Sequence, residues 1–279
     1  MSDELKPEKL AHVAGEMLRI AKDSPDARKA GNNFAASVLT VTELLENVLL
    51  PVKAINYGLG RAKEYMATKF GPELAEKTSG IPDEFLIEPK ASVVGPALQS
   101  MAFTLDEKPL KDMYLSLIAA AMDGRDPDAA HPAFAEIIRQ LSTPEAIALP
   151  AFLLADGVAV VEVRIQAPDG TEYFVPLQHL AETVDAAGRP FENERFPAWV
   201  DNWVRLGLVE VSYSKSLAEK DAYAWVESQV AYDNLLKNRP SDAEEGWTQT
   251  FVKGSLQTTA WGTAFAAATG LASLPDVQH

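Results

Sequence analysis

The spacing of apolar residues predicts that the first half of the chain is helical. Between residues 108 and 122, one apolar stripe repeats with the i, i+3, i+4, i+7 spacing of an amphipathic helix. The stripe consists of Leu110, Met113, Tyr114, Leu117, Ile118 and Ala121. The same spacing predicts a helix over residues 7–22 and a helical region over residues 34–70, which Pro51 interrupts.

Two predicted helices meet at residues 141–143. The first begins at Pro132. Its inward-facing residues are Phe134, Ile137, Ile138 and Leu141. The second begins with Thr143 as its N-cap and Pro144 in its first turn. Neither helix carries a set of reactive side chains, so we interpret the joint as architecture between the helical half and the mixed half.

After Gly157 the pattern changes to the period of a β-strand. The stretch "VAVVEVRIQAPDGTEYFVPL" is near-alternating and contains a Pro-Asp-Gly turn, which predicts a hairpin over residues 158–177. A short helix is expected from Leu177 to Val184. A longer helix is expected from Pro197 to Leu206, and Gly207 is expected to end it.

The rest of the chain alternates strands and helices. The stretch "LVEVSYS" predicts a strand, and Ser216 with Glu219 forms a capping box for a long helix that ends near Pro240. The stretch "GSLQTT" predicts a second strand, and Thr259 is expected to cap a last helix. We expect the first of these strands to pair with residues 254–258, across the insertion between them.

From residue 143 onward, this order of elements is that of a winged helix with an enlarged first strand. The sequence therefore predicts a mainly α fold with a small β component, of the α+β class. Residues 1–142 form a helical domain in this interpretation. Residues 143–279 form a winged-helix-like domain that contains the hairpin (158–177) and a helical wing insertion (216–240).

Charge and composition narrow the classes of partner. The chain has 279 residues and a formal net charge of −15, and none of the five segments 1–30, 31–90, 91–150, 151–195 and 196–279 is net basic. Because phosphate binding needs a positive face, nucleic acid is disfavoured as a partner. The absence of cysteine, of a signal-peptide pattern and of a long apolar run predicts a cytoplasmic protein.

Three stretches carry a family resemblance. They are the long run from "EPKASVVGPALQSMAFTL" through "AAAMDGRDPDAAHPAFAEIIRQLS", then "FPAWVDNWVRLGLVEV", then "LQTTAWGTAFAAAT". In these stretches the chain resembles the bacterial abortive-infection alpha (Abi-alpha) family, over most of residues 40–270 and most closely at 88–150. The resemblance implies a cytoplasmic bacterial protein linked to phage defence, and it supplies no catalytic motif.

The residues themselves contain no recognisable catalytic or cofactor motif. We therefore expect a protein that is not an enzyme and that binds no metal or cofactor. His131 follows Asp123, Asp126 and Asp128, but a calcium loop opening at Asp123 would place Phe134 where a Glu is required. We interpret these acidic residues as complements to a helix N-terminus. His12 and His179 are interpreted as surface or satisfied residues.

One segment is locally basic. Within residues 44–70, Lys53, Arg61, Lys63 and Lys69 follow the apolar stretch "LLENVLLP". A basic amphipathic segment can lie on an anionic membrane surface. The competing interpretation, which we favour, is a solvated helix face that covers the core.

The predicted helix after Pro197 carries two tryptophans. Trp199 and Trp203 lie at helical spacing, which favours core anchors, but Trp199 and Arg205 are also candidate contacts to a partner. Since Asp201 opposes the few basic residues there, we expect this helix to face a protein rather than DNA.

These observations leave three functional hypotheses. The first is a non-enzymatic phage-defence or protein-interaction protein with an unidentified protein partner. The second is a winged-helix DNA-binding transcriptional regulator. The third is a membrane-surface effector that acts through residues 44–70.

Overall fold

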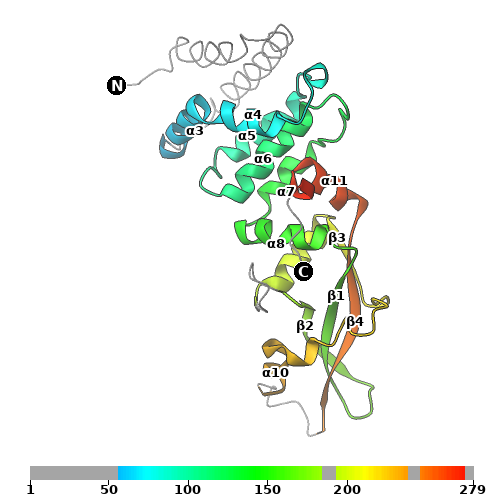
Figure 1. The fold of residues 1–279 in the computed structure, drawn as a ribbon. Coiled ribbons are helices and arrows are strands. Elements are labelled where there is room, and N and C mark those ends of the chain that lie inside the picture. The colour runs from blue at the N-terminus through cyan, green and yellow to red at the C-terminus, as the bar shows by residue number, and fades with distance from the viewer. Residues whose placement is uncertain (1–55, 184–192, 238–245, 274–279) are drawn as a thin grey trace. The chain divides into compact units, whose positions relative to one another are not determined.

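The computed structural model describes residues 56–183, 193–237 and 246–273 (Figure 1). The predicted helix over residues 7–22 and the first part of the 34–70 region lie outside these ranges. The chain divides into two compact units. The first contains Met1–Ile147 and Ala266–Leu274, and the second contains Ala148–Phe265 and Pro275–His279.

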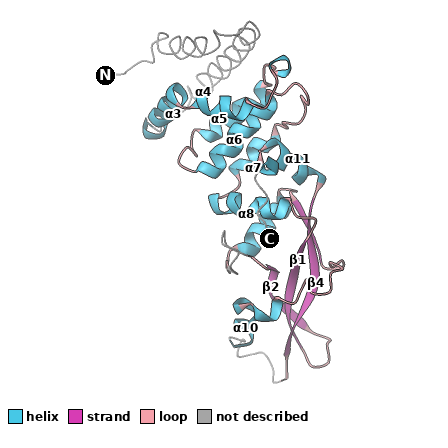
Figure 2. Ribbon diagram, in the orientation of Figure 1, coloured by secondary structure: helices cyan, strands magenta, loops and turns pink. Residues whose placement is uncertain are grey.

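The described residues confirm the α+β class. They contain nine α-helices and one four-stranded antiparallel sheet (Figure 2). None of the helices in these ranges is long and apolar enough to cross a membrane.

The first unit is a packed group of helices. Its helices are α3 (Asn56–Thr68), α4 (Phe70–Thr78), the 3-10 turn η2 (Asp83–Phe85), α5 (Ala91–Met101), α6 (Lys108–Ala121) and α7 (Ala133–Arg139). Helix α8 (Thr143–Leu153) and helix α11 (Ala260–Ala268) each have residues in both units, and η4 (Leu271–Ser273) closes the first.

Helix α6 forms the centre of this first unit. It packs against α4, α5 and α7. The six residues of its predicted apolar stripe are all buried, which confirms the prediction. Each buried side chain of this size, such as Leu117 or Ile118, stabilises the folded state by about 1.5–3 kcal/mol relative to leaving that side chain in water.

A polar contact ties three helices of the first unit together. The Tyr65 hydroxyl on α3 donates to Glu73 Oε2 on α4 at 2.6 Å, and Lys111 Nζ on α6 donates to the same oxygen at 2.7 Å. Burial alone would raise the pKa of Glu73, but the bonds from Lys111 and Tyr65 outweigh it and lower that pKa. Glu73 is therefore ionised at neutral pH, where it holds both partners.

The joint between α7 and α8 is built as predicted, except for its cap. All four inward-facing residues of α7 and the joint are buried. The N-cap of α8 is Ser142 rather than Thr143, because Ser142 forms a capping box with Glu145. The Glu145 carboxylate accepts from Ser142 N at 2.8 Å and from Ser142 Oγ at 2.7 Å. Thr143 instead donates to Glu107.

The second unit is built on the sheet, whose strand order is β2-β1-β4-β3. The strands are β1 (Val158–Gln166), β2 (Tyr173–Ala181), β3 (Val209–Ser212) and β4 (Thr248–Thr258). Strand β4 pairs with β1 along the whole of β1, and with β3 from Val209↔Thr258 to Ser212↔Ser255. The predicted pairing of the strand after Gly207 with residues 254–258 is confirmed.

Helix α9 (Phe196–Arg205) precedes β3 and ends in a tight reversal. Its buried residues are Phe196, Val200 and Trp203, and Gly207 has a φ of +74°, which favours glycine. Helix α11 begins against this reversal, because Thr259 N donates to Leu208 O at 3.1 Å. Gly262 N donates to Thr259 Oγ1 at 2.9 Å, so the predicted Thr259 cap is confirmed.

The predicted short helix from Leu177 to Val184 is wrong. Residues 177–181 are the end of strand β2, and the hairpin therefore extends beyond residue 177. A bulge in β2 places His179, Leu180 and Ala181 in consecutive buried positions. The partly buried Leu177 and the buried Leu180 and Ala181 therefore have the i, i+3, i+4 spacing of a helix, although they lie on a strand.

The predicted long helix of the insertion is also wrong. The described part of residues 216–240 contains only the 3-10 turn η3 (Val226–Ser228) and helix α10 (Val230–Lys237). Leu217, Tyr223 and Val226 pack on the sheet with Val161 and Val163. The Tyr223 hydroxyl accepts from Leu217 N at 2.8 Å and donates to Gly254 O at 2.7 Å. These tertiary contacts override the local helix signal.

A pair of glycine substitutions tests the packing of α11. A Cβ on Gly262 would lie 2.0 Å from Leu208 O, whereas a Cβ on Gly95 in α5 meets nothing within 4 Å. We expect Gly262→Ala to destabilise the protein by about 3 kcal/mol, because backbone must move to admit the methyl group. Gly95→Ala should stabilise it by about 0.5–1 kcal/mol. Urea unfolding followed by circular dichroism measures both, and equal effects would contradict the fold at α11.

Candidate functional site

The two faces of the sheet differ in chemistry. Val161 and Val163 of β1 lie in the apolar cluster that the insertion covers. Because side chains alternate along a strand, Glu162 and Arg164 lie on the opposite face. We call the residues that are linked there the polar cluster: Glu162, Arg164, Gln178, His179, Asp201 and Tyr213.

A bulge in β2 positions His179. Leu180 pairs with Val161 and Leu177 pairs with Val163, so Gln178 and His179 together oppose the single residue Glu162. His179 has a φ of 57°, in the left-handed region that non-glycine residues rarely adopt. Such a conformation costs on the order of 1–3 kcal/mol, so the surroundings must hold it in place.

Tyr213 holds His179 through two contacts. The His179 backbone N donates to the Tyr213 hydroxyl at 3.0 Å, and the same hydroxyl lies 3.0 Å from His179 Nδ1. Since the hydroxyl oxygen accepts from the backbone, its own proton is available to Nδ1. That assignment leaves the imidazole proton on Nε2, which lies 3.2 Å from Asp201 Oδ1 on α9.

This contact joins the two edges of the sheet. Strands β2 and β3 are the outermost strands of the order, and Tyr213 directly follows β3. The sheet therefore curls until Tyr213 reaches the bulge in β2. The aromatic ring passes so close to β4 that a Cβ on Gly254 would lie 2.6 Å from Tyr213 Cδ1. Only glycine leaves room for the ring at that position.

Glu162 is a buried carboxylate with two donors. It is 6% exposed, and it accepts from Arg164 Nε at 2.7 Å and from Gln178 Nε2 at 2.9 Å. The Arg164 guanidinium also lies over the Tyr173 ring, 4.2 Å from the ring centroid. A buried charge that is paired and hydrogen-bonded in this way is tolerated, whereas an unpaired one is not.

The electrostatics of the cluster keep Tyr213 protonated. Burial raises the pKa of the Tyr213 hydroxyl, the charges of Glu162 and Asp201 raise it further, and the bond from the His179 backbone lowers it, which gives a pKa of about 12. The carboxylate–imidazole–hydroxyl chain therefore contains a neutral phenol at physiological pH. In this geometry the chain acts as a hydrogen-bond clamp between β2 and the residue that follows β3.

The residues of the predicted basic segment do not all fall in the described ranges. Lys53 and the side chain of Lys63 lie outside them. Arg61 on α3 forms an exposed ion pair with Asp106 at 2.5 Å, and Lys69 is an exposed residue at the start of α4. Exposed pairs of this kind contribute little to stability. Membrane contact stays a prediction.

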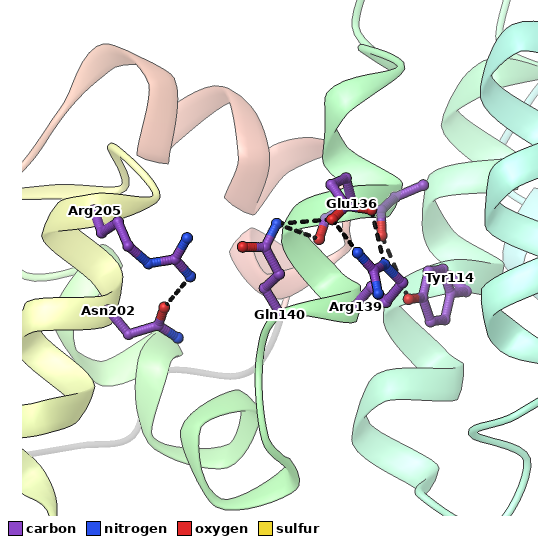
Figure 3. Close-up of polar contacts among 7 residues, drawn as sticks. Tyr114, Glu136, Arg139, Gln140, Asn202 and Arg205 are labelled. Atoms are coloured by element: carbon purple, nitrogen blue, oxygen red, sulfur yellow. Dashed lines mark hydrogen bonds and ion pairs between the residues drawn. The ribbon is translucent and has the colours of Figure 1, made fainter.

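The residues of the predicted recognition-like helix lie on α9. Trp203 is fully buried against Phe152 and Phe196, with ring centroids 5.3 and 6.0 Å away. Trp199 is half-buried beside Phe196. Arg205 is exposed, and its guanidinium donates to Asn202 Oδ1 at 2.6 Å (Figure 3). The helix thus has Trp203 in the core and both Trp199 and Arg205 accessible at its surface.

Figure 3 also draws a polar group on α6 and α7 of the first unit. Arg139 donates to both carboxylate oxygens of Glu136, at 2.8 and 2.5 Å, and Gln140 Nε2 lies 3.0 Å from Glu136 Oε1. The bond from Arg139 lowers the pKa of Glu136. The Tyr114 hydroxyl donates to Ala135 O at 3.4 Å. The bonds of Glu136 lie within α7 and its C-cap, and the bond from Tyr114 connects α6 to α7.

Two of the three acidic residues that precede His131 form ion pairs with cationic side chains. Asp123 accepts from Arg125, and Asp128 accepts from Lys90 at 2.7 Å. His131 Nδ1 accepts from Ala133 N at 3.1 Å, at the start of α7. Among the described residues, no group of three or more His, Cys, Asp or Glu is arranged to hold a metal ion.

The comparisons with known proteins identify the family. The model of the abortive infection alpha family matches residues 62–269, which is most of the chain. The chain belongs to the abortive infection alpha family. No curated protein and no solved structure matches it. The family match spans both units, so α9 and the polar cluster lie inside the part of the chain that defines membership.

Sequence reasoning did not find the polar cluster. The sequence places His179 on a helix, where it has no visible partner, and it places Tyr213 in a strand without a role of its own. A bulge brings Gln178 and His179 together against Glu162, and that irregularity has no local sequence signature. The nearest signal was Gly254 in an otherwise β-prone stretch, since a glycine inside a strand indicates a close approach.

Two tyrosine substitutions test the clamp. Tyr213→Phe removes the acceptor of the His179 N–H and the partner of His179 Nδ1, so we expect a loss of about 2–3 kcal/mol in the free energy of unfolding. The matched control is Tyr173→Phe, which keeps the ring under Arg164 and removes a hydroxyl from a residue that is 51% exposed. Urea denaturation should show almost no change for the control. Equal stability of the two variants would contradict the clamp.

Proposed function

We propose that this protein acts in abortive infection, the process that the family model names, as a phage-defence protein, and that it does so by binding a protein partner rather than by catalysis. The observation that carries the proposal is the family match over residues 62–269. The polar cluster supports the non-enzymatic part, because its hydroxyl and imidazole are occupied in holding two strands together.

The exposed face of α9 is the proposed contact surface. Val204 is 41% exposed, and it directly precedes the exposed Arg205 on α9, whose surface also carries the half-buried Trp199. Trp and Arg are enriched among residues that dominate interface energies, and an apolar neighbour such as Val204 adds contact area. The opposite face of α9 is fixed by Trp203 in the core, so the contact face is presented by a rigid element.

We further propose that α9, β3 and β4 are arranged as in a winged helix. The support is the order helix, reversal at Gly207, strand, insertion and returning strand, with β3 paired to β4. In this interpretation α9 has the place of a recognition helix. Its exposed face carries the acidic Asp201, and its Arg205 is bonded to Asn202, which favours a protein rather than a DNA surface.

A phage challenge tests the proposal. Cells that express the wild-type protein should form fewer plaques than cells without it, across at least one phage of a broad panel. Arg205→Glu should lose this protection, because it reverses charge at the proposed contact face. Lys77→Glu is the matched control, since it makes the same charge change on an exposed residue of α4. Unchanged plaque counts for the wild type over the whole panel would reject the proposal.

A DNA-binding regulator is the second candidate, and the element order after residue 143 favours it. Gel-shift measurements on genomic fragments at low and high salt separate the two candidates. A DNA-binding protein would retard fragments at low salt and release them as salt rises, because counterion release drives such binding. We expect no retardation at any salt concentration.

A further inference from the structure

A small pocket opens in the second unit between β2, the start of α9 and the start of α10. Its apolar walls are Leu177, Leu180, Ala181, Phe196, Pro197 and Ala231. Walls of this kind accept an aliphatic side chain and exclude water from it. The pocket adjoins the N-terminal end of α9, the helix whose exposed face is proposed to contact a partner.

One buried polar side chain lines the pocket. Gln229 is 7% exposed, and its side-chain amide has no hydrogen bond to any other residue that the structure describes. Its backbone is fixed at both ends, because Gln229 N donates to Val226 O and Gln229 O accepts from Asp233 N, each at 3.1 Å. The buried side-chain atoms that lack a partner in the described ranges do not include those of Gln229, so its amide still reaches the open space of the pocket and can bond a ligand with polar groups of its own.

The amide of Gln229 has the same two groups as a peptide bond. Its carbonyl oxygen accepts a backbone N–H, and its NH₂ group donates to a backbone carbonyl. A polypeptide segment can therefore satisfy both groups at once, while one of its side chains enters the apolar part of the pocket. A purely apolar ligand would leave the amide unsatisfied.

The rim of the pocket carries a negative charge. Glu194 lines the pocket, it is exposed, and no residue in the described ranges forms an ion pair with it. A basic residue beside the apolar one would complement Glu194. Rim charges of this kind set specificity and association rate more than affinity.

We propose that this pocket binds a peptide segment of the protein partner, with an aliphatic side chain between Leu177, Leu180 and Phe196, its peptide group on Gln229, and an adjacent Lys or Arg on Glu194. The inference rests on the proposed function, because it names the kind of segment that the partner presents. It extends the contact surface from the exposed face of α9 to the pocket at the start of that helix.

A titration with capped dipeptides on the full chain tests the inference. The probe is Ac-Leu-Lys-NH₂, and the readout is the shift of the Gln229 side-chain NH₂ signals in ¹⁵N–¹H spectra. We expect saturable shifts with millimolar affinity. Ac-Gly-Lys-NH₂ should bind about tenfold or more weakly, because it lacks the buried side chain.

Two variants locate the contact. Gln229→Met keeps a long unbranched side chain without hydrogen-bonding groups, and it should weaken binding, read from neighbouring backbone signals, by up to about tenfold. Glu194→Gln should weaken it about two- to fivefold, as expected for an exposed ion pair. Glu182→Gln removes an equal charge from an exposed residue outside the pocket lining, and it should leave the affinity unchanged. The Glu194 comparison holds even if Gln229→Met fails to fold.

Four results would overturn the inference. The first is that no saturable shift occurs at about 10 mM peptide, and the second is that isovaleramide binds with the same affinity as the dipeptide. The third is that the Gln229 signals shift with protein concentration when no peptide is present. The fourth is that a Gln229→Met variant that no longer binds peptide still gives full phage protection. The second assigns the pocket to small neutral molecules and the third to a second copy of the chain. The fourth leaves the proposed function standing and removes only the pocket from it.

Discussion

The second unit depends on one contact, the bond between the Tyr213 hydroxyl and the backbone of His179. The strands that carry these residues lie at opposite ends of the sheet order, and they approach each other only because the sheet curls. Three features of the sheet and of α9 make this contact possible or extend it. Gly254 leaves space for the tyrosine ring, the bulge in β2 turns the His179 N–H toward the hydroxyl, and Asp201 extends the chain of bonds to α9. The left-handed backbone of His179 is stable because these partners hold it.

The same contact protects the sheet and positions the helix. An edge strand with free N–H groups is a template for unwanted pairing, and β2 is protected by Pro176, by the bulge and by the capture of the His179 N–H. Asp201 lies on the same helix as the proposed contact residues Trp199 and Arg205. The polar cluster therefore adds one bond to the core packing of Trp203, which orients the exposed face of α9. In the proposed function, these titratable groups of the sheet have a structural role that supports recognition at the surface of α9.

The sequence was sufficient where local periodicity and packing agree. The stripe of α6, the inward face of α7, the Gly207 reversal, the Thr259 cap and the pairing of β3 with β4 all follow from spacing and turn chemistry. The sequence was insufficient where contacts between residues far apart in the chain determine the local structure. The bulge at His179 mimics helical spacing, and Tyr223 draws residues 217–226 onto the sheet, although Ser216 and Glu219 form a capping-box signal. Ser142 replaced Thr143 as a cap because two adjacent candidates compete, and only the reach of Glu145 selects between them.

The most direct test of this account is the rate of amide hydrogen exchange at His179. If the Tyr213 hydroxyl captures the His179 N–H, that amide exchanges as slowly as the paired amides of β1 and β4, and it becomes fast in Tyr213→Phe. Exchange at His179 in the wild-type protein that is as fast as at an open strand edge would show that the two edges are not joined. In that case only the core packing of Phe196, Val200 and Trp203 would orient α9.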